Sequence, residues 1–104
     1  MDITVSIVRS LFEPIPGDLS YALRDKTTQV LSRQDKSMLV SAIVDWEDAA
    51  FNRQQVVRLV QELRAVAVQE SLDDPTRTNL VEAADFIERE TDPGLRSFVV
   101  FLGN

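Results

Sequence analysis

The sequence contains neither cysteine nor histidine among its 104 residues. Without cysteine the chain forms no disulfide and has no thiol chemistry, and without histidine it lacks the general base of Ser-His-Asp and Cys-His catalysis. Zinc sites built from thiolates or imidazoles are excluded for the same reason. We therefore expect a protein that is not an enzyme and that holds no cofactor or metal.

Clustered glycines and long apolar runs are missing as well. The three glycines stand apart from one another, so the chain has no phosphate-binding loop. The longest apolar run, Phe98 to Leu102, is far shorter than the roughly 20 residues that span a bilayer. The N-terminus has neither the basic start nor the apolar stretch of a signal peptide. We therefore expect a cytoplasmic protein without membrane contacts.

Positive charge is in the minority. Eleven basic residues stand against 17 acidic ones, which gives a net charge of −6. This sign is wrong for binding nucleic acid or an anionic membrane, so we expect a protein partner that is itself basic. The length corresponds to one domain, residues 1–104. Hydrophobic residues make up 44% of the chain, which is enough to form a core.

The N-terminal half leaves two segments open between helix and strand. In residues 1–12, Ile3, Val5 and Ile7 alternate as in a strand, whereas other apolar residues of the segment fit one helical face. Asp18 is a good N-cap for a helix that continues to Ser32. Residues 36–46 follow a possible cap at Asp35 and favour a helix, with a buried strand as the alternative.

The C-terminal half predicts two well-defined helices. Asn52 and Gln55 fit a capping box that begins a helix over Arg53–Glu70. Asp74 as N-cap and Pro75 at the first helical position begin a second helix, Pro75–Thr91. Apolar residues at helical spacing form the inner faces of the two helices: Val56, Leu59, Val60, Leu63, Val66 and Ala67 in the first, and Leu80, Ala83, Ala84 and Ile87 in the second.

The expected fold is mainly α: a single-domain helical bundle of about four helical segments. Phe98 to Leu102 is predicted to be a short buried strand or an extended tail in the core. A short β pairing that involves the termini is compatible with this arrangement.

The negative charge is concentrated in one stretch. Residues 70–92 contain eight acidic and two basic residues, which accounts for the whole net charge. On a helical wheel, Glu82, Asp85 and Asp92 fall within about 80° of one another, opposite the apolar face. Such an acidic stripe can steer a basic partner, and the alternative is a face that only contacts solvent.

A second acidic group surrounds the only tryptophan, in Asp45-Trp46-Glu47-Asp48. A tryptophan beside carboxylates is typical of a binding rim, and the alternative is that Trp46 completes the core. Calcium binding here or at Asp73-Asp74 is disfavoured because the ligand spacing of a calcium loop is absent. The predicted partner-binding residues are Glu82, Asp85, Glu88, Asp92, Asp73, Asp74, Asp45, Trp46, Glu47 and Asp48.

Two stretches carry a resemblance to known proteins. Phe51-Asn52-Arg53-Gln54-Gln55 with Leu59 and Glu62-Leu63, and the end Phe98-Val99-Val100-Phe101-Leu102-Gly103-Asn104, resemble small bacterial proteins of unassigned function with an FN-x-x-Q…EL helix and an FLG(D/N) terminus. The chain also looks like the immunity proteins of polymorphic or contact-delivered toxin systems, which are commonly small, acidic and free of cofactors. The resemblance implies a binding protein in a bacterial cytoplasm and assigns no functional residue.

Three functions follow as hypotheses. The first is an inhibitor of the immunity type that neutralises a basic toxin, such as a nuclease, through an acidic face. The alternative is a regulatory or adaptor subunit, or a homodimer, that uses Val57 and Val68, which lie away from the apolar stripe of their helix. The third, a small hydrolase or carboxylate-metal enzyme, is the least favoured because histidine and cysteine are absent.

Overall fold

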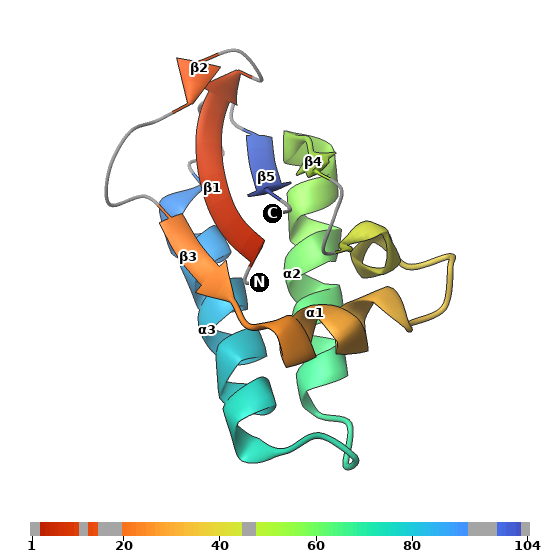
Figure 1. The fold of residues 1–104 in the computed structure, drawn as a ribbon. Helices are drawn as coiled ribbons and strands as arrows, with labels where there is room; N and C mark the ends of the chain where they lie inside the picture. Colours follow the sequence, from red (N-terminus) through yellow and green to blue (C-terminus); the bar gives the residue numbers. More distant parts are fainter. Residues whose placement is uncertain (1–2, 11–12, 15–19, 45–47, 92–97, 103–104) are drawn as a thin grey trace.

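The computed structural model describes residues 3–10, 13–14, 20–44, 48–91 and 98–102 of the chain. Its centre is an antiparallel sheet in which β1 (Ile3–Ser10) pairs with β5 (Phe98–Leu102) along one edge. Along its other edge, β1 pairs with β2 (Glu13–Pro14) and then with β3 (Ser20–Leu23). The sheet ends at β4 (Ala49–Phe51), which pairs with β5 (Figure 1).

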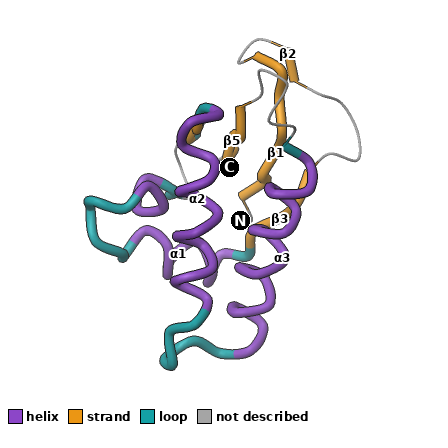
Figure 2. Tube along the Cα trace, turned by 180° about the vertical axis from the view of Figure 1, so that it is seen from behind, coloured by secondary structure: helices purple, strands orange, loops and turns teal. Residues whose placement is uncertain are grey.

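The two long helices lie on one face of this sheet and form a second layer (Figures 1 and 2). α2 (Arg53–Ala67) and α3 (Asp74–Glu90) are antiparallel neighbours joined by a short turn. The short helix α1 (Asp25–Ser32) lies across the lower part of this pair, and the 3-10 helix η1 (Leu39–Ala42) packs beside α2.

The expected mainly α bundle is therefore wrong: the chain has an α+β fold. The two terminal segments do pair, and their strands, β1 and β5, lie in the middle of the five-stranded sheet. Residues 3–10 form a strand, since Ile3, Val5 and Ile7 are buried on one face while Thr4 and Ser6 are more exposed. β-Branched side chains favour this arrangement because a helix restricts their rotamers.

The helix predicted from Asp18 to Ser32 is wrong in its first part and correct only for residues 25–32. Ser20–Leu23 is the strand β3, and Asp18 lies outside the described residues. The apolar spacing that suggested one continuous helix mixes the two sides of a strand with a following helix, since Leu23 is buried and Ala22 is exposed. Pairing with β1 decides the outcome, because Leu23 lies opposite Ile3 in the core.

The segment 36–46 has only one turn of 3-10 helix in its described part, in place of the helix that its pattern favours. A buried carboxylate explains where the turn forms. Glu62 on α2 accepts a hydrogen bond from the Val40 backbone N–H at 3.1 Å and one from Arg58 Nε at 2.8 Å. The carboxylate therefore ties η1 to the side of α2 and keeps its own charge paired.

The two C-terminal helices are confirmed, with shifted ends. The Asn52–Gln55 capping box is formed in both directions. α2 ends at Ala67 rather than Glu70, and the Arg77 guanidinium caps this end by donating to the backbone oxygens of Ala67 and Gln69 at 2.8 and 3.0 Å. The N-cap of α3 is Asp73 and not Asp74, as the Asp73 carboxylate accepts the Thr76 N–H at 2.9 Å.

The core fills the space between the two layers. The predicted inner faces of both long helices are buried, and they meet the inward side chains of the sheet. Phe51 and Phe101 make an edge-to-face contact there, with ring centres 5.6 Å apart. No described helix covers the opposite face of the sheet (Figure 1). Its described side chains are uncharged: Thr4, Ser6, Ser20, Ala22, Ala50, Val100 and Leu102.

Candidate functional site

The candidate site is the outer surface of the α2–α3 pair, which we call the hairpin face. We define it by seven exposed or half-exposed residues: Val57, Arg64, Val68, Val81, Glu82, Asp85 and Glu88. At 100° per residue, the three from α2 and its C-cap lie within about 40° of one another. Arg64 joins this arc to Asp85 and Glu88 of α3 through ion pairs. Glu82 lies further round α3, on the side of β3.

Arg64 holds two of the predicted acidic residues. Its guanidinium donates to Glu88 at 3.0 and 3.2 Å and to Asp85 at 3.0 Å. These hydrogen bonds keep the pKa of the Glu88 carboxyl below its ordinary value and raise the pKa of Arg64. The Glu88 carboxylate therefore stays ionised, and Arg64 fixes Glu88 and Asp85 side by side and balances part of their charge within the chain.

Glu82 is held from the other side of α3. Its carboxylate accepts a hydrogen bond of 2.8 Å from the Tyr21 hydroxyl on β3. That hydroxyl accepts in turn from the Asn79 amide at 3.0 Å. Burial, together with the hydrogen bond to Glu82, raises the pKa of Tyr21, so the phenol stays protonated and keeps donating.

Asn79 is the centre of a buried network that also positions α1. Its side-chain oxygen accepts from the Arg24 N–H at 2.9 Å and from the Thr27 hydroxyl at 2.7 Å. Its nitrogen donates to Tyr21 and, at 3.1 Å, to the backbone oxygen of Ala22. All four hydrogen-bonding positions of this amide are thus used.

Two of the other predicted acidic residues have structural tasks. Asp73 caps α3 and is paired with the Lys26 ammonium, and both contacts keep the pKa of its carboxyl well below the ordinary value. Asp74 lies in the first turn of α3, where it pairs with Arg77 at 3.2 Å. These residues fix the turn between α2 and α3 and do not belong to the hairpin face.

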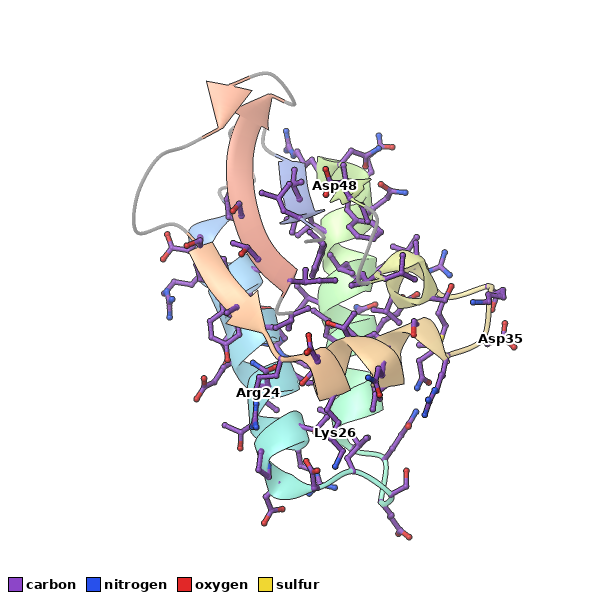
Figure 3. The ribbon with its side chains drawn as sticks, in the orientation of Figure 1. Arg24, Lys26, Asp35 and Asp48 are labelled. Atoms are coloured by element: carbon purple, nitrogen blue, oxygen red, sulfur yellow. The ribbon has the colours of Figure 1, made fainter. Side chains whose placement is uncertain are left out.

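The acidic group around the tryptophan is separate from the hairpin face. Asp48 precedes β4, whereas Glu82 binds β3, and these strands lie at opposite edges of the sheet. Figure 3 shows Asp48 beside β4 and far from Arg24 and Lys26 on the other side of the molecule. Asp45, Trp46, Glu47 and Asp92 lie outside the described residues.

Exposed valines accompany the carboxylates. The exposed fractions are 65% for Val57, 77% for Val68 and 39% for Val81. The sequence prediction that Val57 and Val68 lie off the buried stripe is confirmed. Val81 lies within about 60° of Asp85 and Glu88 on the wheel of α3, so apolar and acidic side chains share this surface.

Sequence reasoning missed Arg64 and Asn79. The spacing of residues along one helix does not indicate contacts with another helix, so the sequence could not predict the ion pairs of Arg64 with α3. Asn79 did have one, because it falls among the apolar positions of α3. A polar residue on a buried arc indicates a side chain whose hydrogen bonds are all made inside the protein.

The described part of the chain contains no group of three acidic residues close enough to hold a metal ion. Within the same ranges, none of the helices has the length and apolar character needed to cross a membrane. No protein-family model, curated protein or solved structure matches the chain. The resemblance to immunity proteins therefore stays a prediction.

Proposed function

We propose that this chain is a protein-binding inhibitor of the immunity type, which neutralises a basic bacterial toxin by docking through the hairpin face. The observation that carries the proposal is the combination of three held carboxylates with three exposed valines on the outer sides of α2 and α3. Carboxylates select a basic partner and speed its approach, and apolar side chains supply contact area once water is excluded.

The charge of the hairpin face remains negative after its internal pairing. Glu82, Asp85 and Glu88 stand against the guanidinium of Arg64, while Arg89, which lies between Asp85 and Glu82 on the wheel of α3, is paired with Glu90. Since Arg64 and Tyr21 already fix these side chains, the side chains lose little rotamer entropy when a partner binds. A basic cleft, such as the active site of a nuclease, is the kind of surface that complements this arrangement.

The size of the molecule is adequate for such an interface. A standard protein–protein interface buries about 800 Å² on each partner. The accessible surface of the protein is 6224 Å², so a standard interface would use about one eighth of it. The two helices of the hairpin face, 15 and 17 residues long, can present that area without any change of fold.

Site-specific photo-crosslinking in the source bacterium tests the proposal. A photoreactive amino acid is placed singly at Val57, Val68 or Val81 and, as matched controls, at Ala22 or Ala50 on the open face of the sheet. We expect the same basic protein to be captured from all three hairpin positions and from neither control. Capture of that protein only from the sheet positions, or no capture from the hairpin face, would contradict the proposal.

Self-association through the open face of the sheet, whose described side chains are uncharged, is the second candidate. A chain of net charge −6 repels its own copy least where its surface has no charge, which favours this face over the hairpin face. The same experiment separates the two functions, because a homodimer gives crosslinks between two copies from Ala22 or Ala50. Sedimentation at micromolar concentration would show a dimer in that case and a monomer otherwise.

A further inference from the structure

A cleft separates α1 from the turn that joins α2 to α3, and we call it the α1 cleft. Its volume is about 220 Å³. One wall is formed by Lys26, Val30 and Arg33, which recur at helical spacing and share one side of α1. The turn contributes Gln69, Leu72 and Asp73 to the other wall. Figure 3 shows Lys26 on the side of α1 that is turned towards this part of the molecule.

The two walls are tied together at both ends. At one end the Lys26 ammonium pairs with the Asp73 carboxylate. At the other end the Gln69 side-chain nitrogen donates to the Gln34 side-chain oxygen at 3.0 Å. Because contacts between distant parts of the sequence close both ends, the cleft is formed before any ligand arrives.

The interior of the α1 cleft combines an apolar floor with one unbalanced charge. Val30 and Leu72 are half-buried and pack against the core. The charge of Lys26 is balanced by Asp73. The exposed guanidinium of Arg33 makes no hydrogen bond or ion pair with any residue in the described ranges. A free guanidinium beside an apolar floor suits an anion that carries a small hydrocarbon body.

We propose that the α1 cleft binds a small aliphatic carboxylate, with the carboxylate on Arg33 and the hydrocarbon body on Val30 and Leu72. Sites for drug-sized ligands enclose roughly 300–1,000 Å³, so this smaller cleft suits a ligand of only a few carbon atoms. A planar guanidinium matches a carboxylate with two parallel hydrogen bonds. This chemistry occurs both in free aliphatic acids and in the last residue of a protein chain that ends in leucine.

Titrations followed by ¹⁵N–¹H NMR test the proposal with three probes: 4-methylpentanoate, its uncharged amide, and N-acetyl-glycyl-leucine. We expect saturable shifts of the Lys26, Val30 and Leu72 amide signals with at least one of the two acids. Binding of 4-methylpentanamide should be at least ten-fold weaker than binding of the corresponding acid, because the amide lacks the charge. The tighter of the two acids identifies the source of the ligand, as a free acid or a chain end.

Arg33→Gln should weaken the binding of the acids at least ten-fold. Arg53→Gln is the matched control: Arg53 is also exposed and has no partner among the described residues, but it begins α2 away from the cleft. The Arg53→Gln variant should bind the two acids with the wild-type affinity. Absence of saturable shifts up to 10 mM acid, or equal binding by the Arg33→Gln variant, would overturn the proposal. Neither result bears on the hairpin face, so the two proposals fail separately.

Discussion

Two hydrogen-bond networks fix polar side chains of α3, and they differ in their exposure to water. On the side of β3, the buried Asn79 amide bonds to Tyr21, Thr27 and the backbone around Ala22. On the side of α2, Arg64 bonds to Asp85 and Glu88 at the surface. The two networks have similar distances and flank the same helix.

Because the two networks differ in burial, we expect the Asn79 network to contribute to stability and the Arg64 cluster to contribute to partner binding. A buried polar group that loses its partner has no water to replace it, whereas exposed ion pairs contribute little to the free energy of unfolding. We therefore expect the Asn79 network to hold β3, α1 and α3 together. The Arg64 cluster adds little to stability, so its carboxylates are available to a partner.

The largest expected loss of stability is at Leu63, whose side chain is fully buried. This loss serves as a reference for the variants in the two networks. Leu63→Ala should lower the free energy of unfolding by about 2–5 kcal/mol in a denaturant melt. Val57→Ala, an apolar truncation on the outer side of the same helix, should cost less than about 0.5 kcal/mol. A loss below about 0.5 kcal/mol for Leu63→Ala would show that this position is not in the core.

The second prediction compares the two networks directly. Asn79→Ala leaves several buried groups without partners and should cost about 2–3 kcal/mol of unfolding free energy. Arg64→Gln, in contrast, should lower the free energy of unfolding only slightly, because its ion pairs are exposed and water replaces most of their contribution. Equal losses in the two variants would mean that burial does not distinguish the networks.

The third prediction is that polar contacts of α3 respond to opposite ends of the pH scale. Tyr21 of the Asn79 network responds in alkali, whereas Glu88 of the Arg64 cluster and Asp73, the N-cap of α3, respond in acid. The raised pKa of Tyr21 means that its stabilising contribution is complete below the ordinary value near 10 and is lost as pH rises through the folded value. The lowered pKa values of Asp73 and Glu88 mean that their contributions are complete above about pH 4.5 and are lost in acid.

Denaturant melts between pH 2 and pH 11 measure these contributions. Tyr21→Phe should flatten the alkaline decline and leave the acid decline unchanged. The double variant Asp73→Asn, Glu88→Gln should do the reverse, since asparagine retains the N-cap while both titrations are removed. An alkaline decline of wild-type steepness in Tyr21→Phe would contradict the role of the phenol.

Local signals along the chain were sufficient for the two long helices. Asn52, Gln55 and the apolar stripe of α2 define a start and a buried face within a single segment, and the capping box forms as expected. The ends of the helices depend on distant side chains. Arg77, on the following helix, caps the end of α2, and a helical wheel contains no information about that contact.

The sheet required information that single segments do not contain. Ser20–Leu23 is too short to show a period of its own, and its pairing with β1 is what makes it a strand. For the candidate site, the wheel of α3 placed Glu82 and Asp85 away from the apolar face, and both side chains are exposed. It did not reveal that Arg64 and Tyr21 hold them, because both contacts cross between elements.

The rate of association with the partner captured by crosslinking tests the central claim most directly. The variant Glu82→Lys, Asp85→Lys is compared with Asp35→Lys, Asp48→Lys, which has the same net charge but alters residues away from α3 (Figure 3). In low salt we expect the first variant to associate at least ten-fold more slowly than the wild type and the second to change much less. Added salt should bring the wild-type rate towards that of the first variant. A folded Glu82→Lys, Asp85→Lys variant that associates at the wild-type rate in low salt would contradict the account.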